Sequence, residues 1–238
     1  MKRLILLIFF LISTTLFAQL FSQNFSSSST LSDYISASPN SGQFDNITSS
    51  GSASVSITNN ALGLSKTNLA GTARFNRITN LNSGTIDGMI FVFTVIVSGN
   101  ASSQTSAARV FVGSNVGNNG STPVNTDYYA RLAINFGSSD GQFSIRDMES
   151  GTNSSTYTGA QTITWVLNNT GSLMSYSAPD ATTENVENDK IDVWVGATKI
   201  FNDISPDNSA TFSGNLVQFK GVLDVGSGTV IFDSFNIV

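Results

Sequence analysis

Six polar and aromatic side chains on three of the expected strands have the chemistry of a ligand-binding face. They are Trp194, Tyr129, Arg131, Arg146, Asn135 and Asp192. Aromatic rings offer a flat surface of large area, and the charged and amide groups beside them can donate and accept hydrogen bonds. Sugar binding uses this combination. The sequence therefore predicts a carbohydrate-binding face, unless a second sheet, a loop or a neighbouring strand covers these side chains.

Alternation along segments 128–136 and 142–148 assigns most of this set to one side of a hairpin. If the two strands pair with Phe136 opposite Phe143, successive side chains point to opposite faces of the sheet. The core face then contains Tyr128, Leu132, Ile134, Phe136, Phe143 and Ile145. The outer face contains Tyr129, Arg131, Asn135, Ser144 and Arg146. An apolar face opposite a polar and aromatic face is typical of a strand pair at the surface of a β-sandwich.

The two tryptophans have opposite predicted environments. In segment 191–195 the odd-numbered residues are apolar, so Asp192 and Trp194 are expected to point away from the core. In segment 162–168, Trp165 shares a face with apolar side chains, so it is predicted to lie in the core.

Several reaction classes are excluded by composition. The chain contains no cysteine and no histidine. Nucleophilic triads of the Ser-His-Asp and Cys-His types are therefore impossible, and so is an imidazole zinc site. We expect no enzyme activity on these grounds.

The elements that must position the predicted face are short strands. Charged residues make up 11% of the chain, and Ser, Thr, Asn and Gly are abundant, a composition that disfavours helices and suits strands joined by turns. One edge strand is expected around Asn24. The other strands are expected at 53–57, 62–66, 73–78, 88–97, 108–113, 128–136, 142–148, 162–168, 173–177, 191–195, 199–202, 216–225 and 229–237.

The N-terminus predicts export. A basic start at Lys2 and Arg3 is followed by the apolar run 4–12 and a small residue, Ala18, which is the layout of a secretory signal peptide. The run is about half the ~20 residues of a membrane-spanning helix. We therefore expect a signal peptide at 1–18, a single β-sandwich domain at 19–238, no transmembrane helix, and a secreted or cell-surface location.

The charge balance argues against nucleic acid as a partner. The formal net charge is −5, and it becomes −7 once Lys2 and Arg3 leave with the signal peptide. Binding to phosphate backbones requires a basic surface, so an extracellular glycan is the expected partner instead.

Three segments together resemble the concanavalin-like lectin/glucanase superfamily, as found in exported bacterial β-sandwich domains. They are QNFSSSSTLSDYI near the start, TITWVLNNTGSLMSYSAPDATTENV in the middle and GSGTVIFDSFNIV at the end. The resemblance implies an all-β fold, a two-sheet antiparallel jelly-roll β-sandwich. It also implies that the closing strand lies beside the N-terminal strand.

Glucanases that share this fold place their acids as Glu-x-Asp-x-Glu or Glu-x-Asp-x-x-Glu on one strand. This chain has three glutamates, Glu149, Glu184 and Glu187, and none has that spacing. Hydrolysis of a glycosidic bond needs two carboxylates that flank it. We therefore expect a non-catalytic binding module, with a structural or adhesive surface protein and a divergent glycoside hydrolase as the alternatives.

A structural calcium ion is the one cofactor that the sequence leaves open. Alternation places Asp233 on the same face as the apolar Phe235, where a carboxylate must be paired, hydrogen-bonded or bound to metal. Jelly-roll binding modules often hold calcium between the first and last strands, and Asp233 with Asn24 or Asp45 could do this. The alternative is that Asp233 accepts hydrogen bonds from the backbone or from an arginine.

Overall fold

The computed structural model describes residues 18–238. The predicted signal peptide therefore lies outside the described residues, apart from Ala18. Within this range the chain contains no helix with the length and apolarity that a bilayer crossing needs.

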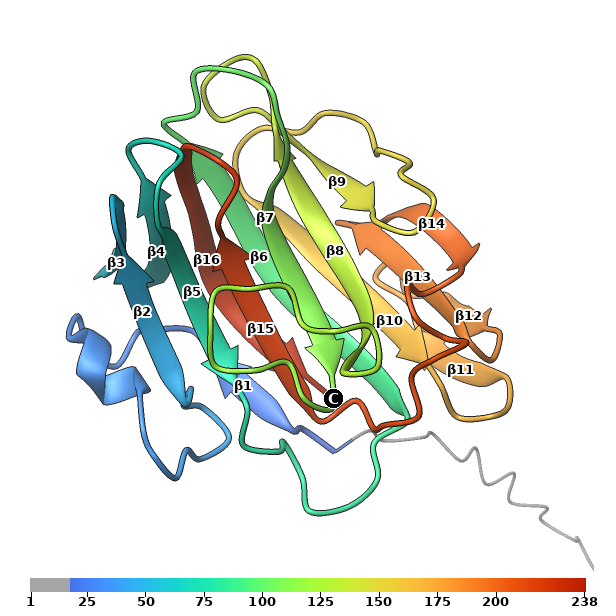
Figure 1. Ribbon diagram of the computed structural model, residues 1–238. Helices are drawn as coiled ribbons and strands as arrows, with labels where there is room; N and C mark the ends of the chain where they lie inside the picture. Colours follow the sequence, from blue (N-terminus) through green and yellow to red (C-terminus); the bar gives the residue numbers. More distant parts are fainter. Residues whose placement is uncertain (1–17) are drawn as a thin grey trace, which may run out of the picture.

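Strands make up most of the regular structure (Figure 1), together with one 3-10 turn, η1, at Leu31–Tyr34. The first eight are β1 Phe21–Gln23, β2 Asn46–Ser50, β3 Ala53–Thr58, β4 Ala61–Lys66, β5 Thr72–Arg77, β6 Gly88–Ser98, β7 Gln104–Gly113 and β8 Tyr128–Phe136. The others are β9 Phe143–Asp147, β10 Gln161–Asn168, β11 Met174–Ser177, β12 Thr183–Val186, β13 Lys190–Val195, β14 Thr198–Ile204, β15 Gln218–Leu223 and β16 Gly228–Ile237. The predicted strands are present, but the first ends at Gln23, before the Asn24 around which it was expected. Strands β2 and β12 were not predicted.

Two sheets pack face to face. The eight-stranded sheet has the order β14-β13-β10-β6-β16-β4-β3, with β1 also paired to β16, and the six-stranded sheet has the order β2-β5-β15-β7-β8-β9. In Figure 1 the strands β15, β7 and β8 lie in front of β16, β6 and β10. Strands β11 and β12 form a separate hairpin. Every pairing between named strands is antiparallel, so the expected all-β antiparallel sandwich is confirmed.

The closing strand joins the two ends of the chain. Strand β16 pairs with β1, with Phe21 opposite Ile237, and it also pairs with β6 and β4. The expectation that the last strand lies beside the first is therefore confirmed.

The core lies between the sheets and is rich in aromatic rings. Along β6 every second side chain is buried, because a strand turns alternate residues toward the partner sheet. The ring of Phe235 packs against Phe75 at 5.0 Å and Phe232 at 5.4 Å between centroids. Trp165 is fully buried, as predicted. Each large apolar side chain buried in this way contributes about 1.5–3 kcal/mol.

The hairpin of β8 and β9 has the predicted register, with Phe136 opposite Phe143 and Ile134 opposite Ile145. Ile134 and Phe136 are buried in the core. Two assignments in β8 are wrong, those of Tyr128 and Tyr129. Val112 pairs with Ala130 while Gly113 pairs with Tyr128, so Tyr129 is an extra residue without a partner in β7.

This β-bulge at Tyr129 reverses the alternation before it. Tyr129 therefore points into the main core and is fully buried, whereas Tyr128 packs on the outer side of the sheet with Phe111. The same effect occurs in β16. Phe232 pairs with Val95 and Ser234 with Thr94, which leaves Asp233 as the bulged residue. Asp233 is exposed, not directed into the core as expected.

Candidate functional site

The structure divides the predicted binding face between two sheets. Arg131, Asn135 and Arg146 lie on β8 and β9 of the six-stranded sheet, whereas Asp192 and Trp194 lie on β13 of the eight-stranded sheet. Because the core separates the sheets, the two groups point to opposite sides of the sandwich. They cannot form one continuous surface with Tyr129, which lies inside.

The hairpin of β11 and β12 covers Trp194 and Asp192. Trp194 is 2% exposed and Asp192 is fully buried. The indole Nε1 of Trp194 donates to the hydroxyl of Tyr176 at 2.9 Å, and that hydroxyl donates to Asp192 Oδ2 at 2.5 Å. Burial and the hydrogen bond to Asp192 raise the pKa of Tyr176. The expectation of an exposed tryptophan platform is wrong, because a strand that was not predicted, β12, completes the cover.

Loops cover much of the other group. Arg131 Nε is 2.7 Å from Asp207 Oδ1, in the segment between β14 and β15. Asn135 Nδ2 donates to Asn153 Oδ1 at 2.9 Å, and Arg146 Nη1 donates to the same oxygen at 3.1 Å. These side chains hold the surrounding loops in place. Their role in ligand binding stays a prediction.

The residues expected to bind calcium do not form a site. Asp45 accepts hydrogen bonds from the backbone amides of Ile78 and Thr79 at 2.8 and 2.9 Å. Asn24 Oδ1 accepts from the amide of Ser26 at 3.2 Å. Asp233 is exposed on its bulge. Within residues 18–238 no group of three or more acidic, His or Cys side chains is arranged to hold a metal ion. The calcium prediction does not fit this arrangement.

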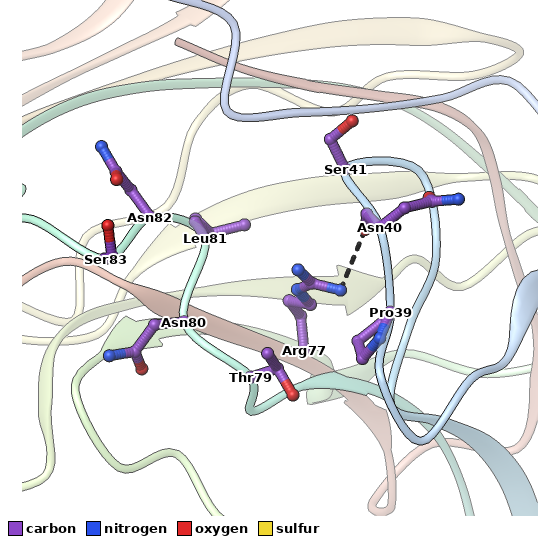
Figure 2. Close-up of a pocket in the computed structure, with 9 residues that line it drawn as sticks. All are labelled: Pro39, Asn40, Ser41, Arg77, Thr79, Asn80, Leu81, Asn82 and Ser83. Atoms are coloured by element: carbon purple, nitrogen blue, oxygen red, sulfur yellow. Dashed lines mark hydrogen bonds between the residues drawn. The ribbon is translucent and has the colours of Figure 1, made fainter.

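An open pocket of about 460 Å³ lies between two loops. In Figure 1 these loops lie at the lower end of the sandwich. They are segment 36–43, which precedes β2, and segment 78–87, which joins β5 to β6. The pocket lining is shown in Figure 2 and consists of Pro39, Asn40, Ser41, Arg77, Thr79, Asn80, Leu81, Asn82 and Ser83. The lining contains amide and hydroxyl groups, two apolar side chains and one cation, but no carboxylate.

The same turn forms both walls of this pocket. The tripeptide Asn-Ser-Gly occurs at 40–42 and again at 82–84. In each copy the asparagine Oδ1 accepts from the glycine amide, at 2.8 Å for Asn40 and 3.2 Å for Asn82. These are Asx turns, which fix the asparagine side chain against its own backbone. Neither Nδ2 group donates a hydrogen bond within the described part of the chain.

Arg77, the last residue of β5, lies between the two walls and is 3% exposed. Its Nη1 donates to the carbonyl oxygens of Asn40 at 3.0 Å and Gln43 at 2.8 Å. Its Nε is enclosed and has no partner. Burial lowers the pKa of Arg77, and the nearby charge of Asp45 opposes that effect. A guanidinium stays charged in a protein, so the pocket contains a buried positive charge.

Hydrogen bonds to the rest of the fold hold the second wall. The amide of Leu81 donates to the carbonyl of Val217 at 2.9 Å. The side chain of Gln218, at the start of β15, donates to Asn80 Oδ1 at 3.1 Å. A pocket that is fixed before a ligand arrives loses less conformational entropy on binding.

None of the pocket-lining residues belongs to the binding face predicted from the sequence. The sequence signal of the pocket is the repeated Asn-Ser-Gly turn, which alternation rules do not consider because both copies lie in loops. Arg77 lies within the strand expected at 73–78. Alternation along that strand does not indicate that its last residues line a pocket.

The sequence matches no protein-family model and no curated protein. Many solved structures are similar in shape. A carbohydrate esterase, vb_24B_21 from the Shiga toxin-encoding bacteriophage phi24B, superposes with a TM-score of 0.57 at 11% identity over 92% of this chain and 97% of that one. The metal-free carbohydrate recognition domain of Emp46p gives 0.51 at 9% identity, over 92% and 94%.

A protein of unknown function with a galectin-like fold from Bacillus subtilis gives 0.50 at 10% identity, over 92% of this chain and 95% of that one. The chain has a lectin-like jelly-roll fold. The expected likeness to the concanavalin-like superfamily is thereby confirmed at the level of fold, and identities this low say nothing further.

Proposed function

We propose that this protein is a non-catalytic carbohydrate-binding module and that its ligand occupies the Arg77 pocket. One observation carries the proposal: an open pocket lined by amide and hydroxyl side chains has a buried guanidinium at its centre. Binding sites for small polar ligands combine a few well-placed hydrogen-bonding groups with some apolar surface. Leu81 and Pro39 supply the apolar part here.

The amide and hydroxyl side chains of the pocket are suited to the hydroxyl groups and ring oxygen of a sugar. The free Nδ2 groups of Asn40 and Asn82 can donate to hydroxyl or ring oxygens, and the hydroxyls of Ser41 and Ser83 can both donate and accept. The carbohydrate recognition domain of Emp46p, named above for its shape, adds support from fold analogy alone.

Binding is favoured over catalysis by the chemistry that the pocket lacks. Hydrolysis of a glycosidic bond uses two carboxylates, and none of the lining residues is acidic. An esterase triad with histidine cannot be formed, because the chain has no histidine. We further propose secretion, which the layout of residues 1–18 supports.

The test is a glycan array followed by calorimetry on the purified protein. We expect at least one class of glycan to bind, and Asn82→Ala to weaken that binding about tenfold, the value of one well-placed hydrogen bond. Asn119→Ala is the matched control, because Asn119 is an exposed asparagine whose Oδ1 caps a similar turn in another loop, with Ser121 at 3.0 Å. It should leave the affinity unchanged.

Two results would count against the proposal. An array without any bound glycan would overturn the function. Equal affinities for Asn82→Ala and Asn119→Ala would place the ligand elsewhere on the molecule.

A further inference from the structure

We infer that the glycan bound in this pocket is acidic, with a carboxylate that pairs with the guanidinium of Arg77. The inference rests on the proposed function and names the ligand class for the same site. The supporting observations are that Arg77 donates to two backbone carbonyls and that it forms no ion pair within the described residues.

Arg77 has no acidic partner of its own within the part of the chain that the structure describes. Within the described chain, ion pairs join Arg109 to Asp224, Arg131 to Asp207, and Lys199 to both Asp192 and Glu184. Among residues 18–238, no carboxylate lies within ion-pair distance of Arg77. A buried charge is costly unless it is paired and fully hydrogen-bonded. The folded protein retains this unpaired charge beside an opening to solvent.

The guanidinium of Arg77 has one terminal nitrogen, Nη2, that is available to a ligand. Nη1 is occupied by two carbonyl oxygens, and Nε is enclosed. Nη2 donates no hydrogen bond within the described residues and, unlike Nε, is not among the enclosed polar atoms without a partner. In Figure 2 the terminal nitrogen that does not bond to Asn40 points into the space between the two loops, toward Leu81 and Ser41. The pocket therefore presents a charged donor to its occupant.

The negative charge of Asp45 raises the pKa of Arg77, against the effect of burial. The two oxygens of Asp45 already accept from the amides of Ile78 and Thr79 and from the hydroxyl of Thr79 at 2.5 Å. These bonds stabilise the turn that follows β5. Asp45 lowers the net charge near Arg77, but it does not occupy Nη2.

The open pocket distinguishes Arg77 from another buried cation, Lys220. Lys220 also has no carboxylate partner among the described residues, but it is fully buried and donates to the carbonyls of Val116 at 3.0 Å and Ser121 at 2.7 Å. The loop between β7 and β8 closes over it. Arg77 lines an open pocket instead, and charge-assisted bonds from a guanidinium to a carboxylate are stronger than those to neutral oxygens.

Matched ligand pairs test the inference on the unaltered protein. The probes are oligosaccharides of galacturonate, glucuronate and mannuronate, each with its neutral methyl ester, and sialyllactose with lactose. The acid of at least one pair should bind about tenfold more tightly than its neutral partner at low salt, and this preference should shrink at high salt. Neutral glycans that bind while no acid exceeds its partner would overturn the inference and leave the proposed function intact. If nothing binds, the proposed function fails, and the inference fails with it.

Arg77→Met provides a second measurement. It should bind the acid and the ester equally, while Arg77→Lys should keep part of the preference because it retains charge without the planar fork. An undiminished preference in a folded Arg77→Met variant would show that another group recognises the acid. If Arg77→Met does not fold, the matched pairs and their salt dependence on the unaltered protein still decide the question.

Discussion

Lys199 and Arg77 are both largely buried cations. Lys199 has acidic side chains within ion-pair distance, whereas Arg77 has none among the described residues. Lys199 Nζ is 2.9 Å from Asp192 and 3.0 Å from Glu184, and it lies 5.1 Å from the centre of the Trp194 ring. Burial alone would lower the pKa of Lys199, but the hydrogen bonds and charges of those two acids outweigh it and raise the pKa. For Arg77, burial prevails and lowers the pKa.

This difference separates a structural cluster from a candidate site. Under the β11–β12 hairpin, each charged group has a partner in the same chain, so nothing remains for a ligand. In the pocket, the guanidinium keeps a donor that the fold does not use. A largely buried cation is present in both places. The completeness of its hydrogen-bonding and ionic partners, not its charge, therefore distinguishes the candidate binding site from the structural cluster.

The largest expected effect tests the structural side of this comparison. Asp192→Ala removes the acceptor for Tyr176, Lys199 and the amide of Asp203. Breaking a buried ion pair by removing one partner costs about 3–5 kcal/mol. We expect a loss of that size in the free energy of unfolding measured with urea. Glu187→Gln, an exposed acid next to β12, is the control and should change stability very little.

If Asp192→Ala costs no more than the control, the cluster does not hold the hairpin, and the distinction drawn above is wrong. The effect on affinity is also informative. A ligand bound at the Arg77 pocket should bind folded Asp192→Ala as tightly as the unaltered protein.

Lys220 is a buried cation that donates hydrogen bonds to two backbone carbonyls and lies over the ring of Phe111. Burial, followed by the charges of Arg74 and Arg109, lowers the pKa of Lys220 from 10.5 to about 8. Below pH 8 both the folded and the unfolded chain carry the proton. Between pH 8 and 10.5 the unfolded chain is protonated and the folded chain is not, so the free energy of unfolding rises with pH.

We expect this rise to be about 2 kcal/mol relative to Lys220→Met, since one pKa unit corresponds to about 1.4 kcal/mol and the full shift is an upper limit. Urea unfolding of both proteins across this pH range gives the difference. Parallel curves for the two proteins would mean that Lys220 titrates normally and is not enclosed.

The third prediction is the counterpart of the first. Arg77→Met removes two hydrogen bonds to carbonyls but also removes the cost of burying an unpaired charge. The net loss of stability should be only about 1 kcal/mol. A loss as large as that of Asp192→Ala, measured in the same urea titrations, would indicate that Arg77 serves the fold as fully as Lys199 does.

Much of the fold could be predicted because alternation is a direct consequence of strand geometry. It identified Ile134, Phe136 and Trp165 as core residues, and the structure confirms each of them. It failed at Tyr129 and Asp233 for one shared reason. A single bulged residue reverses the pattern, and no residue type marks the bulge in either strand.

The candidate site could not be predicted in the same way. Trp194 does point outward from its sheet, but the hairpin that covers it includes β12, a polar strand whose sequence Thr-Glu-Asn-Val gives little signal. The pocket depends on two loops far apart in the sequence that meet at the end of β5. Which loops meet at one end of the sandwich is decided by the order of strands in the sheets. Local sequence patterns do not reveal that order.

The smallest expected effects give the most specific test of the pocket. Asn40→Ala and Asn82→Ala each remove one Asx hydrogen bond at an exposed turn, so each should lower stability by only about 0.5 kcal/mol. Because the two turns share no partner, their effects on the free energy of unfolding should add in the double variant.

The effects of the same substitutions on ligand affinity should not be additive. If the two asparagines bind the same sugar, the ligand can shift once either side chain is removed. The second substitution should then reduce the binding free energy by less than it does in the unaltered protein. Calorimetry on the single and double variants measures this coupling, and strictly additive losses of affinity would mean that the two loops do not grip one ligand together.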